Sequence, residues 1–307
     1  MVKLHCFWLQ DAAKVFHYLT EIGADIIIHD IKSNNGLHHA AIMGSVEIIK
    51  ILLDKGMYVQ LTNATDSMPL HFSAHYGNLE AMKALVKTGA PLNNANKDGA
   101  TPLLLGARYG KIEVFCYLTE IGADINIHDI NSNSALHHAA SMGSVEIIKI
   151  LLDKEMSVDL TNAENSTLHL SALIRNLEVM EALCERGAPL NNADKDGETP
   201  LFLAARCGKT EVFHYLTDVA TDINIRDVNS NIALHHAAFM GSVAIIKILL
   251  HKGMSVELKN STDPTLHFSA YYGNMKSTTA LVERGAPLTT LIRKVKLHCI
   301  WLQTMAK

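Results

Sequence analysis

A leucine-centred segment recurs along the chain at an almost fixed spacing, and this repeat restricts the possible folds more than any other feature. The leucines lie 32 or 33 residues apart, at Leu4, Leu37, Leu70, Leu103, Leu136, Leu168, Leu201, Leu234 and Leu266. Similar text surrounds them, such as PLHFSA at 69–74, TPLF at 199–202 and LHHAA beginning at Leu37. A period near 33 indicates one small unit stacked many times. Such a unit cannot bury its apolar face alone, so neighbouring units must share a continuous core.

A second, longer period lies above the first. The segment SVEIIKILL occurs at 45–53 and again at 144–152, and SVAIIKILL stands at 242–250. The two ends also match, because residues 2–10 read VKLHCFWLQ and residues 295–303 read VKLHCIWLQ. Three repeats therefore form a block of about 98 residues that is present three times. Block duplication explains this likeness without any selected function.

One unit, residues 30–62, shows how the sequence specifies two helices. Leu37 begins a small apolar stripe that suits a short, closely packed helix, and Gly44 ends it, because glycine tolerates the left-handed backbone there. Ser45 is a good N-cap for a second helix, and Glu47 suits its first turn. The apolar residues of 46–53 recur with the helical period of 3.6 residues. Gly56 ends this second helix.

The chain resembles the ankyrin repeat family over nearly its whole length. DKDGETPL at 194–201 is similar to the family's hairpin tip and first helix, GKTEV at 208–212 to the turn into the second helix, and GADIN at 122–126 to the exit. The resemblance implies an all-α repeat solenoid, an ankyrin-type stack of helix, turn, helix and hairpin. We expect a single array over residues 1–307. Its expected units are 1–29 (degenerate), 30–62, 63–95, 96–128, 129–161, 162–193, 194–226, 227–259 and 260–291, followed by a half repeat at 292–307.

Composition excludes several classes of function. The net charge of −4 argues against an extended surface for nucleic acid, which usually carries a basic stripe. No apolar stretch approaches the ~18 residues that would insert directly into a membrane. The five cysteines are odd in number and lack C-x-x-C spacing, which favours unpaired thiols and an intracellular, cytoplasmic location. A monomer is the expected oligomeric state.

Histidine is abundant, and three His-His pairs begin at His38, His137 and His235. Adjacent residues on one helix point about 100° apart, and the pairs lie three repeats from one another, so they cannot share a metal ion. In the ankyrin family, the first histidine of each pair occupies a position where the imidazole hydrogen-bonds the backbone of nearby loops. We therefore interpret these histidines as structural. The sequence contains no phosphate loop, H-E-x-x-H or paired-carboxylate signature, so we expect no enzyme activity, cofactor or metal.

The resemblance also locates a candidate binding surface. In ankyrin proteins, the concave face is formed by hairpin tips and by the exposed side of the first helix. The two residues before each inter-helix glycine, here called the doublets, lie on that face. Among the three blocks, one doublet reads His-Tyr, then Leu-Ile, then Tyr-Tyr, while the second-helix cores barely change. Drift at tolerant positions explains this equally well. The partner-binding candidates are His75, Tyr76, Arg108, Tyr109, Phe239, Met240, Tyr271 and Tyr272.

Three functions are compatible with this pattern. The leading hypothesis is a non-enzymatic scaffold that binds a protein partner through the concave face. The second is an adaptor or effector arm, of the ubiquitin-ligase receptor or pathogen effector type. The third is a fragment of a larger ankyrin-repeat protein, such as a channel or membrane-skeleton protein, which the ending midway through a repeat favours. A longer reading frame would separate the last two from the first.

Three repeats depart from the family pattern. Glu155 stands where other units have Gly56 and Gly253, Ala220 replaces the counterpart of Gly122, and Arg175 replaces an inter-helix glycine. A side chain in the left-handed region costs about 1 kcal/mol relative to glycine. We therefore expect residues 144–221 to be the least protected segment. Trp8 and Trp301 lie in the matching terminal segments, and we expect an apolar patch at the C-terminal one, where Trp301 and Ile300 would lack a covering second helix.

Overall fold

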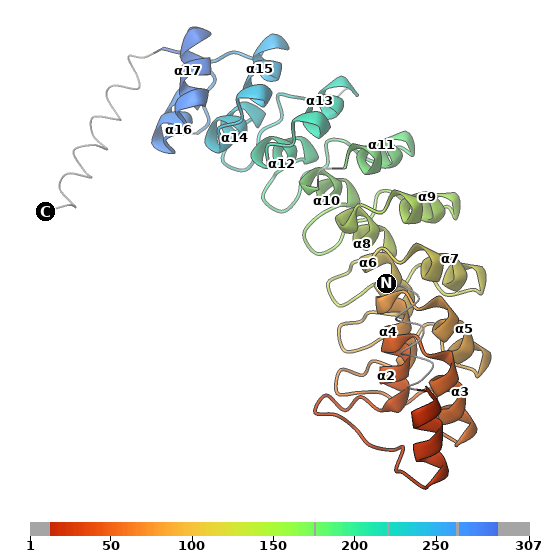
Figure 1. Ribbon diagram of the computed structural model, residues 1–307. Coiled ribbons are helices and arrows are strands. Elements are labelled where there is room, and N and C mark those ends of the chain that lie inside the picture. The colour runs from red at the N-terminus through yellow and green to blue at the C-terminus, as the bar shows by residue number, and fades with distance from the viewer. Residues whose placement is uncertain (1–12, 175, 220, 262–263, 288–307) are drawn as a thin grey trace, which may run out of the picture. The chain divides into compact units, whose positions relative to one another are not determined.

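In the computed structural model, residues 13–174, 176–219, 221–261 and 264–287 are described. The described chain is all-α, with short helices joined by turns and hairpin loops and no β-strand within those ranges (Figure 1). The expected all-α repeat fold is therefore confirmed. The half repeat at 292–307, both tryptophans, Arg175 and Ala220 lie outside the described residues.

The chain divides into two compact units, residues 1–163 and residues 164–307. In the first unit, a helix over residues 13–21 precedes four helix pairs. The pairs are α2 (Gly36–Met43) with α3 (Val46–Asp54), α4 (Pro69–Tyr76) with α5 (Leu79–Lys87), α6 (Pro102–Arg108) with α7 (Ile112–Glu120), and α8 (Ala135–Met142) with α9 (Val145–Asp153).

The second unit has the same construction. Its pairs are α10 (Thr167–Leu173) with α11 (Leu177–Glu185), α12 (Pro200–Arg206) with α13 (Thr210–Asp218), α14 (Ala233–Met240) with α15 (Val243–His251), and α16 (Thr265–Tyr271) with α17 (Met275–Glu283). In both units, each first helix contacts the next first helix, and each second helix contacts the next second helix. Each unit is therefore a stack of helix pairs in two layers.

Local sequence explains where the helices begin and end. Thr101 and Thr199 accept hydrogen bonds from backbone N–H groups of the first helical turn, and a proline follows each of them at the position that needs no N–H donor. Gly44 ends α2 with φ 74°, Ser45 caps α3 through Ile48 N, and Glu47 lies in its first turn, as the sequence predicts.

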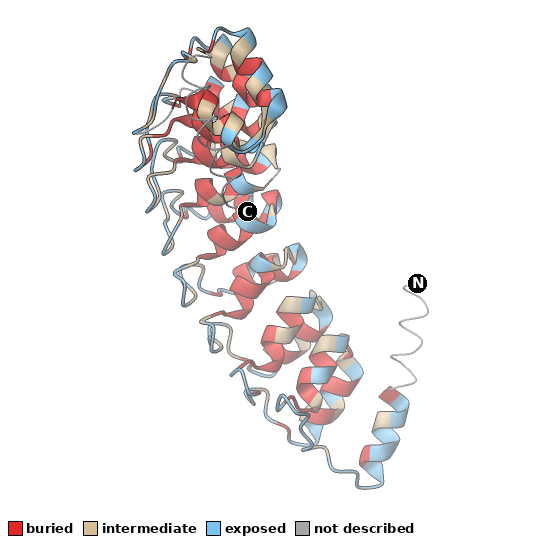
Figure 2. Cartoon of the chain, turned by 90° about the vertical axis from the view of Figure 1, so that its left-hand side faces the viewer, coloured by how far each residue is buried: buried red, intermediate tan, exposed pale blue. Residues whose placement is uncertain are grey.

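The core of each unit lies between the layers and between neighbouring pairs (Figure 2). The first helices contribute mostly small and medium side chains, such as Ala74 and Leu103, together with the ring of Phe202. The second helices contribute branched aliphatic side chains and the fully buried rings of Phe115 and Phe213. This division leaves one side of each first helix free to carry residues that the core does not require.

Candidate functional site

Two of the first-helix histidines, His38 and His169, tie neighbouring repeats together. The Nδ1 atom of His38 accepts a hydrogen bond from Asn35 N (3.1 Å), and its Nε2 atom lies 2.9 Å from the carbonyl oxygen of Ser67 in the next hairpin. His169 repeats the arrangement with Ser166 N (3.2 Å) and the Glu198 carbonyl (2.9 Å). The structural role expected for His38 is confirmed, and His169 has the same role.

Burial keeps these imidazoles neutral. It lowers the pKa of His71 and of His137 to about 4, because a buried imidazolium loses its hydration. A neutral ring can accept at Nδ1 and donate at Nε2 at the same time, as His38 and His169 do.

The second histidine of each pair closes a hairpin tip, a role that the sequence did not reveal. His39, His138 and His236 each place Nε2 within 3.0–3.1 Å of the carboxylate of Asp30, Asp129 and Asp227, respectively. The same carboxylates accept hydrogen bonds from backbone N–H groups two and four residues later. The recurrence of an aspartate nine residues before the second histidine was the available signal.

Two asparagines form hydrogen bonds to the C-terminal ends of first helices, and the sequence did not reveal this role either. Asn78 Nδ2 donates to the carbonyl oxygens of Ala41 and Ile42, both at 2.8 Å. Asn274 Nδ2 donates to the carbonyls of Ala238 (3.2 Å) and Phe239. Each bond fixes the backbone next to a doublet of the preceding repeat, so the doublet side chains project from a rigid position.

In the first unit, the candidate residues form an aromatic group. The ring of His75 lies 4.6 Å from that of Tyr76 and 3.9 Å from that of Tyr109. Tyr76 is 48% exposed, Arg108 is exposed, and His75 and Tyr109 are half-buried. Burial, with help from the charges of Lys111 and Arg108, lowers the pKa of His75 and favours its neutral form.

In the second unit, the other four candidates form a similar group. The rings of Phe239 and Tyr272 meet edge to face at 4.3 Å, and Tyr271 packs against Tyr272 at 4.9 Å. Tyr271, Tyr272 and Met240 are 62%, 50% and 48% exposed, while Phe239 is half-buried. The two aromatic groups belong to different compact units.

One doublet is already occupied by a contact within the protein. Arg206 donates from Nη2 to Glu198 Oε2 (2.8 Å), and Nδ1 of His236 lies 3.8 Å from the other oxygen of that carboxylate. Burial raises the pKa of Glu198, although Arg206 opposes this shift. Arg206 therefore supports its own hairpin, and it is a weaker candidate for partner contact than the aromatic doublets.

Reactive groups are not assembled in the described parts of the chain. No cluster of three or more His, Cys, Asp or Glu side chains among the described residues has the arrangement of a metal site. Burial raises the pKa of Cys184 to about 11 and also raises that of Cys116, so neither thiol is activated as a nucleophile. In addition, no helix in the described ranges combines the length and apolar character of a membrane span.

Comparison with known proteins agrees with this architecture. The family model described as ankyrin repeats (three copies) matches residues 4–90, 37–129, 121–194, 159–227, 186–260 and 219–291. The crystal structure of the human ASB11 ankyrin repeat domain is similar with a TM-score of 0.65 and 28% identity, over 72% of this chain and 99% of that one.

Two curated relatives match shorter parts of the chain. The Caenorhabditis elegans homolog of transient receptor potential cation channel subfamily A member 1 is 34% identical over 129 residues, which cover 41% of this chain and 10% of that protein. A probable 26S proteasome regulatory subunit, p28, of Saccharomyces cerevisiae is 30% identical over 147 residues, covering 45% and 64%, respectively. The chain thus spans less than two thirds of the length of either relative.

Proposed function

Because the chain belongs to the ankyrin repeat family, we propose that it is a non-enzymatic scaffold that binds a protein partner through its doublets. In that family the doublets lie on the concave face. The proposal also places the protein inside the cell, since the described cysteines are unpaired and such thiols persist in reducing compartments.

The observation that carries the proposal is the pair of aromatic groups around Tyr76 and Tyr272. Within each group the rings pack on one another, at 3.9–4.9 Å between centroids, while large parts of Tyr76, Tyr271 and Tyr272 stay exposed. Rings held in place lose little side-chain entropy on binding, and tyrosine and arginine are enriched among residues that dominate binding energy. The unactivated thiols, and histidines committed to hairpins and helix ends, support a role without catalysis.

The test is a triple substitution of Tyr76, Tyr109 and Tyr272 by alanine. The intact protein first serves as bait for affinity purification with mass spectrometry, and the affinity of the captured partner is then measured against the variant. We expect the affinity to fall by a factor of about ten or more, with unchanged helical content. Tyr58→Ala is the matched control, because Tyr58 is 76% exposed but lies outside the doublets.

Two outcomes would oppose the proposal. Unchanged affinity in the triple variant would move the site to the second-helix side or to the hairpin tips. A large loss of stability would mean that these tyrosines serve the core instead of a partner.

A role as an adaptor arm or as part of a larger protein remains an alternative. Its support is the length comparison, because the matched segment is 10% of a cation-channel homolog and the chain covers nearly all of the ASB11 ankyrin repeat domain. Sequencing the full transcript separates it from the leading proposal, since this alternative requires a further module in the same reading frame.

A further inference from the structure

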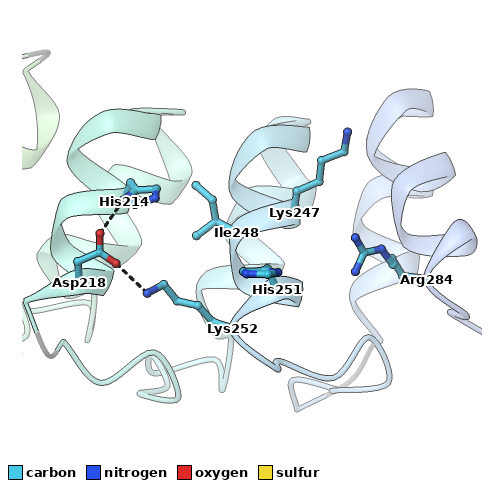
Figure 3. A pocket seen from close by; sticks show the side chains of 7 residues that line it. All are labelled: His214, Asp218, Lys247, Ile248, His251, Lys252 and Arg284. Carbon is cyan, nitrogen blue, oxygen red and sulfur yellow. Dashed lines mark hydrogen bonds and ion pairs between the residues drawn. The ribbon is translucent and has the colours of Figure 1, made fainter.

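A hollow of about 480 Å³ lies among the second helices of the second unit, away from the doublets (Figure 3). Its walls come from the C-terminal parts of α13 and α15 and from the residue that follows α17. The lining residues are His214, Asp218, Lys247, Ile248, His251, Lys252 and Arg284.

The single carboxylate in this lining is already shared between two cationic or basic partners. Asp218 Oδ2 lies 2.8 Å from His214 Nδ1, and its Oδ1 accepts from Lys252 Nζ at 2.9 Å. Lys247, His251 and Arg284 form no ion pair with any residue in the described ranges. The hollow therefore carries an excess of positive charge that the protein itself does not neutralise.

Comparison of α15 with its two copies shows that α15 has lost acidic residues that α3 and α9 both have. Helices α3 and α9 both read VEIIKILLD, whereas α15 reads VAIIKILLH. The only differences are the loss of a glutamate at Ala244 and the replacement of an aspartate by His251. Both differences remove an acid from the helix that forms the middle of the hollow.

At the position of Ala244, another second helix has a glutamate that forms an ion pair with a lysine of the same helix. In α5, Glu80 and Lys83 occupy the same helical positions as Ala244 and Lys247, and their charged atoms lie 2.7 Å apart. Lys247 thus lacks the intrahelical partner that its counterpart Lys83 has.

The helix dipole does not explain the cations by itself. A helix C-terminus favours Lys, Arg or His, which suits His251, Lys252 and Arg284. However, α3 and α9 end in Asp54 and Asp153 at the position of His251, so the repeat folds with an acid there. The dipole also weakens anion binding by only about 0.3–1 kcal/mol per exposed helix end, whereas several cations face this hollow.

We propose that this hollow is a second binding site, and that it takes an acidic segment of a protein partner, with Lys247, His251 and Arg284 contacting its carboxylates. The overall charge of −4 argues against a nucleic acid, which needs a basic stripe, and the few cations of this one hollow suit a short acidic peptide. The site is independent of the doublets, so either proposal can fail without the other.

The experiment measures binding of a fluorescently labelled oligoglutamate peptide to the intact protein by anisotropy. The main variant is Ala244→Glu with His251→Asp, which gives α15 the sequence of α3 and α9 and is therefore expected to fold. We expect this variant to bind about tenfold more weakly, and Lys247→Gln about threefold more weakly, because each exposed ion pair contributes less than about 1 kcal/mol.

Lys50→Gln is the matched control, since Lys50 occupies the position of Lys247 in α3, between Glu47 and Asp54. It should leave peptide binding unchanged. An equal loss in Lys50→Gln and Lys247→Gln would show only general charge attraction and would overturn the proposal.

Two further probes test whether the hollow binds an anionic membrane surface or a small anion instead of a peptide. Vesicles of anionic phospholipid that bind when the peptide does not would assign the hollow to a membrane surface and overturn the proposal. Inorganic phosphate that displaces the peptide at equal concentration of charge would likewise indicate a small-anion site rather than a peptide site.

Discussion

Two helices of the first unit have nearly the same sequence but very different surroundings. Residues 14–21 read KVFHYLTE, and residues 113–120 of α7 read EVFCYLTE. Val15 and Leu19 are 59% and 42% exposed, whereas Val114 and Leu118 in α7 are 1% and 0% exposed. Because α7 packs between α5 and α9, its apolar stripe is covered on both sides. The apolar stripe of a helix therefore gives the surface that the helix is able to bury. The presence of neighbouring helices on both sides determines how much of that surface is buried.

The largest expected effect compares one substitution at the two places. Leu118→Ala should destabilise the protein by about 2–5 kcal/mol, because it leaves a cavity in a packed core. Leu19→Ala should cost less than about 1 kcal/mol, because much of that side chain is already in water. Urea unfolding followed by far-UV circular dichroism measures both. Similar costs at the two sites would show that helix 13–21 is packed as tightly as α7.

The next prediction contrasts a buried histidine with an exposed one. The pKa of His71 is about 4 in the folded protein against an ordinary 6.5, because of burial. A depressed folded pKa means that its stabilising contribution is complete above pH 6.5 and is lost as the pH falls toward 4, by roughly 3 kcal/mol. His71→Gln should lower stability at neutral pH but flatten the dependence on pH.

The control for this prediction lies in helix 13–21. His17 pairs with Glu21 on the surface, with more than half of its side chain exposed. His17→Gln should therefore keep the slope of the unmodified protein between pH 7 and pH 4. If the unmodified protein loses no stability in this range, neutral burial of His71 is wrong.

The smallest expected effect compares the ends of second helices. Glu155 has φ 60°, and its counterparts Gly56 and Gly253 have φ 88°. Since glycine adopts this backbone without strain, Glu155→Gly should stabilise the protein by roughly 0.5–1 kcal/mol. Gly56→Ala should destabilise it by about the same amount, although a Cβ there meets no other atom within 4 Å.

Hydrogen exchange extends this last test to the whole segment. Residues 144–221 are expected to exchange fastest, and Glu155→Gly should slow exchange around α9. The boundary between the two compact units, after Ala163, falls within this segment. Finding residues 144–221 to be the most protected would contradict the expected weakness.

Features that depend on one residue and its own backbone could be predicted from the sequence. The left-handed conformation of Glu155 followed from the glycines at equivalent positions, and the cap at Ser45 followed from its place before an apolar stripe. The bridging imidazole of His38 followed from the family resemblance.

Features that depend on side-chain rotamers and on contacts with neighbouring repeats could not be predicted from the sequence. The contact between the rings of His75 and Tyr109 joins side chains 34 residues apart, and nothing in either helix specifies that the rings meet. The exposure of Leu19 could not be predicted either, because the sequence around it matches that of a buried copy. The basic hollow depends on three helices at once, although the two substitutions in α15 were visible by comparing the blocks.

The hydrogen bond from each bridging histidine has a consequence for how such a chain can grow. His38 and His169 both reach a residue 29 positions ahead, and in each case the acceptor is a main-chain oxygen, once of Ser67 and once of Glu198. Every amino acid supplies that oxygen, so the bond makes no demand on the identity of the residue it reaches. A duplication that places a repeat with such a histidine before another repeat therefore needs no particular side chain to accept this bond. The residue that accepts this bond is thus free to change from one repeat to another, as Ser67 and Glu198 show.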